Sequence, residues 1–444
     1  MSHTRCSNPI YYAKQTQKTS LPVNKNKLQD RRFEEKPENQ PISSNPNPII
    51  SLDLTSEQIK TCNKMKKYSI LYIILCLFMC GCSNKQQEFT TADVATVIDT
   101  AKISVCYAEG FSIDYINDNV CLLKIQDPHK ENTVSYKYAL TKKGSEHERI
   151  PEDYVRIDYP INSIICMTSL QLSNFIKLNA TDVVVGITSA RHLFNKDIKK
   201  QIEDGHTVRI GIEGNFDNEK IIGINPDIIL ISPFKRGGYE ILKEINIPLI
   251  PHLGYKERSP LAQAEWIKFI GLLIGKTEIA NTIFRDIEKR YNDLKDKVIS
   301  TKNRPMVLSG ETRGSTWYAP GGKSFLAQLF NDAGANYFLN SNNESGGINL
   351  DFETVYSRAA NAQYWRIVNN YAGDFTYEAL SDEDERYEDF RAFKEKGIIY
   401  CNMSKTPFYE SMPMEPDLIL ADFIHIFHPE ILPDHSPVYY SLLK

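Results

Sequence analysis

Short, continuous apolar runs separated by amphipathic stretches dominate the chain from about residue 156 onward. Runs such as SIICMTS, DVVVGIT and DIILISP are rich in β-branched residues, and the amphipathic stretch FNKDIKKQIEDG lies among them. The pattern returns from residue 305 in PMVLSGE, QYWRIVNN and GIIYCNM. Continuous rather than alternating apolar runs are typical of parallel strands buried on both faces. The sequence therefore predicts an α/β fold with two lobes, at residues 156–258 and 301–444.

A long helical tract, residues 259–300, lies between the two predicted lobes. Ser259 followed by Pro260 is a typical helix start, and Gly275 is expected to break or kink the helix. Apolar residues then recur at spacings of 4, 4, 3 and 4, which places them on one helical face: Ile283, Ile287, Tyr291, Leu294 and Val298. We expect a single stiff helical connection between the lobes.

The stretch that precedes the first lobe has a different pattern. Residues 101–155 contain strand-like runs on either side of the turn cluster INDN, followed by VSYKYAL. They predict a small antiparallel β subdomain, joined to upstream residues by a polar linker at 83–100. Cys106 and Cys121 lie in this subdomain, and no disulfide pairing is assigned to them.

An apolar run near the N-terminus has the layout of a secretory signal. Residues 65–82 read MKKYSILYIILCLFMCGC, with two lysines before about fourteen mostly apolar residues, which is short for a membrane span. The ending MCGC resembles the bacterial lipobox, which implies lipidation of Cys82; a plain membrane anchor is the alternative. The preceding residues 1–64 are polar and rich in Pro and Asn, and are expected to be disordered. We expect translation to begin at Met65.

Composition and motif spacing argue against several other functions. A net charge of −4 over 444 residues gives no sign of nucleic-acid binding, and the nine cysteines form no metal or disulfide framework. The stretch GSTWYAPGGKS ends like a phosphate-binding loop, but Trp317 occupies the position where that loop needs glycine. No GxSxG motif is present. His425, His428, Glu430 and His435 could suggest zinc, yet their spacing is not HExxH. We predict no enzyme activity, no cofactor and no metal site.

Three stretches together resemble one protein family. NEKIIGINPDIILIS (residues 218–232), GGKSFLAQLFNDAGANYF (321–338) and PDLILADFIHIFHPEILPD (416–434) are similar to the substrate-binding proteins of bacterial ABC importers. The branch is the one that takes up ferric siderophores, haem or vitamin B12. The resemblance runs from about residue 101 to the end. It implies two α/β lobes joined by one backbone helix, with the ligand bound between the lobes.

The resemblance, together with the rule that open α/β sheets bind ligands at the carboxyl ends of their strands, selects the candidate binding residues. Loops that follow predicted strands offer cationic, aromatic and hydroxyl side chains. They are Ser169, Arg191, Phe234, Lys235, Arg236, Arg313, Trp317, Tyr318, Lys323, Tyr371 and Tyr409. Trp317 and Tyr318 could instead pack their own loop down, and Ser324 is expected to cap the helix that follows. Arginine and lysine favour an anionic ligand such as a ferric siderophore; haem and cobalamin remain alternatives.

The family also implies partners. In these proteins one glutamate on each lobe docks onto arginines of the membrane permease, and the matching positions here are Glu219 and Glu353. The resemblance implies a monomeric, lipid-anchored, extracytoplasmic protein that delivers a metal chelate to an ABC permease and its ATPase. An interaction lipoprotein that keeps the fold without transporting anything is the alternative from another class.

Overall fold

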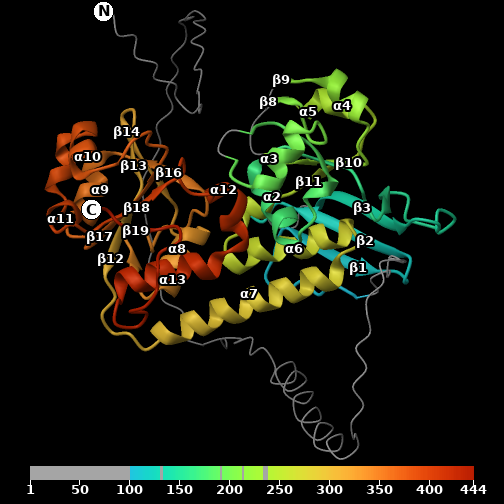
Figure 1. Ribbon diagram of the computed structural model, residues 1–444. Helices are drawn as coiled ribbons and strands as arrows, with labels where there is room; N and C mark the ends of the chain where they lie inside the picture. Colours follow the sequence, from blue (N-terminus) through green and yellow to red (C-terminus); the bar gives the residue numbers. More distant parts are fainter. Residues whose placement is uncertain (1–100, 131–133, 191–192, 213–214, 234–238) are drawn as a thin grey trace, which may run out of the picture. The chain divides into compact units, whose positions relative to one another are not determined.

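The computed structural model describes residues 101–130, 134–190, 193–212, 215–233 and 239–444 (Figure 1). The apolar run at 65–82, including Cys82, lies outside this range, as does the linker at 83–100. Among the described residues, no helix is both long and apolar enough to cross a membrane.

The N-terminal sheet contains four strands in the order β1-β2-β3-β4. They are β1 (Phe111–Tyr115), β2 (Val120–Gln126), β3 (Val134–Lys142) and β4 (Val155–Tyr159). The first three strands pair antiparallel as expected, but β4 pairs parallel to β3. The connection at residues 143–154 returns the chain to Tyr138, midway along β3, so both strands run in one direction. Cys106 and Cys121 are free thiols.

The first lobe is built on a parallel sheet of order β11-β10-β5-β6-β7. Its strands are β5 (Ile164–Cys166), β6 (Val184–Ile187), β7 (Val208–Arg209), β10 (Ile228–Ile231) and β11 (Leu249–Pro251). The described part of the lobe also contains a small hairpin, β8 (Gly211–Ile212) and β9 (Asn215–Phe216), and the α-helices α2 (Ser169–Lys177), α3 (Lys196–Glu203), α4 (Asn218–Ile224) and α5 (Tyr239–Lys243). All four residues of β10 are buried, as the continuous apolar run predicts.

The second lobe carries a sheet of order β15-β12-β17-β18-β19, parallel except for the last strand. Its strands are β12 (Met306–Ser309), β15 (Asn336–Tyr337), β17 (Tyr364–Asn369), β18 (Ile398–Asn402) and β19 (Ser441–Leu442). A second sheet contains β13 (Glu311–Arg313), β14 (Thr316–Pro320) and β16 (Gly347–Leu350). The helices are α8 (Phe325–Asp332), α9 (Phe352–Ala359), α10 (Tyr377–Glu383), α11 (Arg391–Lys394), α12 (Phe408–Ser411) and α13 (Pro416–Phe427).

The chain crosses between the lobes through two consecutive helices, separated at Gly275, where the sequence predicts a break or kink. They are α6 (Pro260–Leu273) and α7 (Thr277–Val298), drawn side by side in yellow in Figure 1. Gly275 separates them with φ of 69°, a left-handed conformation that glycine adopts without steric penalty. The Ser259 side chain caps α6 by accepting a hydrogen bond from the backbone N–H of Ala262. Every residue of α6 is buried, whereas α7 buries one face, so α6 forms the centre of the connection.

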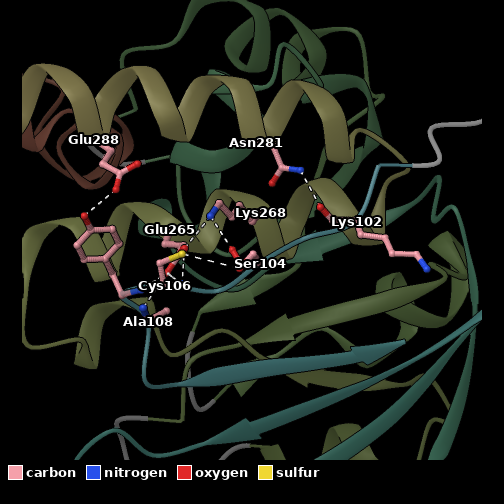
Figure 2. A network of polar contacts seen from close by, with 9 residues as sticks. Lys102, Ser104, Cys106, Ala108, Glu265, Lys268, Asn281 and Glu288 are labelled. Atoms are coloured by element: carbon pink, nitrogen blue, oxygen red, sulfur yellow. Dashed lines mark hydrogen bonds and ion pairs between the residues drawn. The ribbon is translucent and has the colours of Figure 1, made fainter. Parts of the chain in front are cut away.

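Two buried carboxylates, Glu265 of α6 and Glu257 just before that helix, hold the segment before β1, and Figure 2 shows the contacts of Glu265. Glu265 accepts hydrogen bonds from the backbone N–H groups of Cys106, Tyr107 and Ala108 at 2.7–3.1 Å, and its Oε1 lies 2.7 Å from Lys268 Nζ. Glu257 accepts from the N–H groups of Glu109 and Gly110 and from Trp266 Nε1. The N-terminal sheet is therefore tied to the helix that joins the lobes.

Candidate functional site

The candidate residues of the first lobe are only partly described by the structure. Ser169 is the first residue of α2 and lies half-buried directly beyond the carboxyl end of β5, as the sequence predicts. Arg191, Phe234, Lys235 and Arg236 lie outside the described residues.

In the second lobe, Arg313 and Tyr318 come together across the β13–β14 pair. The Arg313 guanidinium lies over the Tyr318 ring, 4.5 Å from its centroid, and 3.5 Å from the Glu311 carboxylate. Arg313 is exposed, and Tyr318 is half-buried against Gly347 of β16, where a Cβ would collide with the ring. Burial raises the pKa of Glu311, and Arg313 opposes that shift. The pair offers a cation and an aromatic face at the carboxyl end of β12.

The remaining candidates of the second lobe are exposed on separate segments. Tyr371 follows β17 and is 36% exposed; Tyr409 lies in α12, beyond β18, and is 38% exposed. Lys323 is exposed in the turn before α8. The Ser324 hydroxyl accepts a hydrogen bond from the N–H of Ala327, so the predicted helix cap is confirmed. These segments present positive charge and aromatic surface.

Trp317 does not fit its predicted place at the ligand. Its side chain is 1% exposed and its Nε1 donates a hydrogen bond to the Ser309 carbonyl. The rings of Trp365, Tyr387 and Phe390 lie 5.4–5.9 Å from it, so the indole is part of the core. The stretch expected to be a loop is instead strand β14, in which alternate side chains face inward. Trp317 packs its own segment down and offers no surface to a ligand.

The two lobes meet through α12 and the residues after it. Glu410, which is 3% exposed, accepts a hydrogen bond of 2.9 Å from the backbone N–H of Phe194 in the first lobe. Glu415 lies 3.2 Å from Lys177, the last residue of α2. Burial raises the pKa of Glu410. The lobes are thus in polar contact next to Tyr409.

A small cavity lies beside this contact and was not predicted from the sequence. It is lined mostly by first-lobe residues, with Gln263 from α6 and Pro413 from the second lobe. The lining residues are Thr168, Leu170, Asn174, Ser232, His252, Gly254, Tyr255, Gln263 and Pro413. They come from five separated parts of the chain, so no local pattern could have grouped them.

Glu219 and Glu353 occupy the same position in corresponding helices. Each is exposed and is the second residue of its helix, α4 in the first lobe and α9 in the second. Each helix is capped by an aspartate, Asp217 or Asp351, whose side chain accepts a backbone N–H. The positive end of the helix dipole favours a carboxylate there. Each lobe therefore presents an exposed carboxylate at the second position of an aspartate-capped helix.

The histidines near the C-terminus have structural partners. His425 Nδ1 lies 2.8 Å from the Leu432 carbonyl, and His428 Nε2 lies 3.2 Å from the Gly334 carbonyl. His435 Nε2 lies 2.7 Å from the carboxylate of Asp422, which is fully buried. Within the described ranges, no three or more His, Cys, Asp or Glu side chains are grouped so as to hold a metal ion.

Comparison with known proteins places this geometry in a family. Residues 164–403, more than half of the chain, match the family described as periplasmic binding protein. The chain belongs to that family. Two uncharacterised lipoproteins of Methanocaldococcus jannaschii are 25% and 24% identical to it, over 83% and 86% of this chain and 93% and 100% of theirs.

Solved structures share the fold at low sequence identity. A periplasmic binding protein from Veillonella parvula superposes with a TM-score of 0.52 at 13% identity, covering 70% of this chain and 98% of that one. A periplasmic haem-binding protein from Pseudomonas aeruginosa gives a TM-score of 0.50 at 15% identity, covering 64% and 98%. The two-lobed α/β fold predicted from the sequence is confirmed. At sequence identities this low, the superpositions show a shared fold and do not indicate which ligand this protein binds.

Proposed function

We propose that this protein is the lipid-anchored solute-binding component of an ABC importer and that it captures a ferric siderophore complex between its lobes. The observation that carries the proposal is the loop set at the carboxyl ends of the second-lobe sheet. In a periplasmic binding protein fold this lobe presents the Arg313 guanidinium over the Tyr318 ring, and Lys323, Tyr371 and Tyr409 are exposed on other segments of the same lobe. Cations with aromatic surface suit a large anionic chelate. Haem, which the Pseudomonas protein is named for binding, is the second candidate ligand, and cobalamin the third.

The lipid anchor and the extracytoplasmic location are part of the proposal. The lipobox-like sequence at Cys82 supports both, as do the two relatives that are named lipoproteins. Delivery requires a permease with its ATPase, because a binding protein of this kind has no path of its own across the membrane.

We assign the contact with the permease to Glu219 and Glu353. Each has an exposed apolar side chain three residues further on, Ile222 (57% exposed) or Tyr356 (38% exposed). Residues three apart are neighbours on a helix surface, so each lobe presents a carboxylate beside an apolar group. Such a pair fits a basic pocket with an apolar rim, and the charges would set orientation and encounter rate.

The test measures how the purified protein stimulates the ATPase of its cognate importer in proteoliposomes. Glu219→Gln and Glu353→Gln should each lower the apparent affinity about tenfold, and the double variant should abolish stimulation. Glu378→Gln is the matched control, because Glu378 is also exposed and is also the second residue of a second-lobe helix, α10. If the double variant stimulates as well as this control, the docking assignment is wrong, and an interaction lipoprotein becomes the better account.

A further inference from the structure

The small cavity beside the contact between the lobes has two buried polar atoms without a protein partner. Asn174 is 1% exposed, and its Oδ1 accepts no hydrogen bond; the Thr168 Oγ1 is also buried and has no partner. A buried polar atom left without a hydrogen-bond partner is destabilising. Both atoms belong to residues that line the same cavity. A group placed in the cavity can hydrogen bond to both atoms.

The lining determines the chemistry of that group. Asn174 Oδ1 can only accept a hydrogen bond, whereas the Thr168 hydroxyl can accept or donate, so a donor group is the one that can satisfy both atoms. No aspartate, glutamate, lysine or arginine lines the cavity. His252 is 6% exposed, and burial lowers its pKa to about 3, so its imidazole is neutral at physiological pH. A charged donor would enter without a counter-ion, which is expensive in a buried site. An uncharged donor is favoured.

The residues around the cavity are held in place by their own contacts. Gln171 Oε1 accepts from the backbone N–H groups of Met167 and Thr168, and Gln171 Nε2 donates to Ser232 Oγ at 3.0 Å. Asn174 Nδ2 lies 3.4 Å from His252 Nε2, which accepts from it. With the Asn174 amide in this orientation, Nδ2 also lies 3.5 Å from the Gln171 carbonyl, and Oδ1 is left without a partner. The cavity has room for about one water molecule, so it takes a single group and not a whole ligand.

We propose that this cavity is a subsite for one uncharged hydrogen-bond donor, a hydroxyl or amide N–H, carried by the bound ligand. The inference rests on the proposed function and narrows it, because it requires a ferric complex with such a donor at its edge. Pro413 of the second lobe forms part of the wall, so the group would be enclosed where the lobes meet. A water molecule offers the same donor chemistry, and the experiment must separate the two sources.

The test uses the full-length protein and two variants that each remove one partnerless buried hydroxyl. Thr168→Val removes the hydroxyl in the cavity and keeps the side-chain shape. Ser309→Ala is the control, because the Ser309 hydroxyl is buried in strand β12, has no partner and lies outside the cavity. Binding is measured with two ferric probes: a tricatecholate whose arms carry amide N–H groups, and the simple tris-catecholate complex, which has none. Thermal midpoints of the free proteins are measured in parallel.

The proposal expects Thr168→Val to weaken binding of the amide-bearing complex about tenfold, with the simple complex unaffected. The midpoint of the free variant should stay unchanged or rise, as it should for Ser309→Ala. Equal binding of the amide-bearing complex by wild type and Thr168→Val would overturn the subsite and leave the proposed function intact. A lowered midpoint with unchanged affinity would mean that an internal water already satisfies the hydroxyl, which also overturns the subsite. If wild type binds neither these probes nor ferric citrate, the proposed function itself fails, and the subsite with it.

Discussion

Replacing Glu265 by glutamine tests the attachment of the N-terminal segment to α6. The Glu265 carboxylate is fully buried and accepts three backbone N–H groups and one Lys268 N–H, with Lys268 only 8% exposed (Figure 2). Glutamine keeps one oxygen but turns an NH₂ group toward donors, and it leaves the Lys268 ammonium buried without its counter-ion. Hydrogen bonds to a charged group contribute about 1.5–3 kcal/mol each, and breaking a buried ion pair costs about 3–5 kcal/mol.

We therefore expect Glu265→Gln to lower the free energy of unfolding by about 3–5 kcal/mol in urea titrations. Backbone amide exchange at Cys106, Tyr107 and Ala108 should accelerate more than exchange in β10. The control is Asp293→Asn, which breaks the Lys289–Asp293 pair; these side chains are 57–74% exposed at 2.5 Å separation, so the loss should be below about 0.5 kcal/mol. Equal losses in the two variants would refute the reasoning that burial gives the Glu265 contacts their strength.

Two further predictions concern buried titratable groups. Burial lowers the pKa of His252 to about 3 in the folded protein, against 6.5 for an exposed histidine. The contribution of the neutral imidazole to the free energy of unfolding should therefore be complete above pH 6.5 and lost as the pH falls toward 3. The difference in unfolding free energy between wild type and His252→Gln should therefore shrink by up to about 1.4 kcal/mol per pH unit below pH 6.5; a constant difference would contradict a neutral buried imidazole. Asp422 accepts hydrogen bonds from the N–H groups of residues 438–440. Asp422→Asn should speed amide exchange there, and unchanged exchange would show that other contacts hold the C-terminal tail.

The fold could be predicted largely because its strands are continuous apolar runs. Segments such as that of β10 indicate burial on both faces whatever their neighbours are. Gly275 likewise marks a helix break by its own conformational freedom. The direction of β4 could not be predicted, because it depends on where the preceding connection places the chain and not on the residues of the strand.

The candidate site was less accessible to sequence reasoning for a similar reason. Glu219 and Glu353 were selected because the family resemblance covers the segments that carry them, and their docking role stays a prediction. Trp317 was assigned to the ligand because a flat aromatic residue in a loop suits one, whereas the rings that bury it come from residues 352–390. The cavity at Asn174 and His252 forms only when separated segments meet, so its residues have no shared signal in the sequence.

The central claim is that the protein binds a ferric siderophore complex, and a ligand titration tests it most directly. The full-length protein would be titrated with a ferric catecholate, ferric citrate, haemin and cyanocobalamin while tryptophan emission is followed. Trp266 is the useful reporter, because its ring lies 4.6 Å from that of His252 in the cavity wall. Coloured ligands also absorb the emitted light. A Trp266→Phe variant separates this absorption from quenching of Trp266 emission by bound ligand. We predict saturable quenching by a ferric siderophore complex, lost in that variant. Saturable binding of haemin or cyanocobalamin alone, or of none of the four, would contradict the claim.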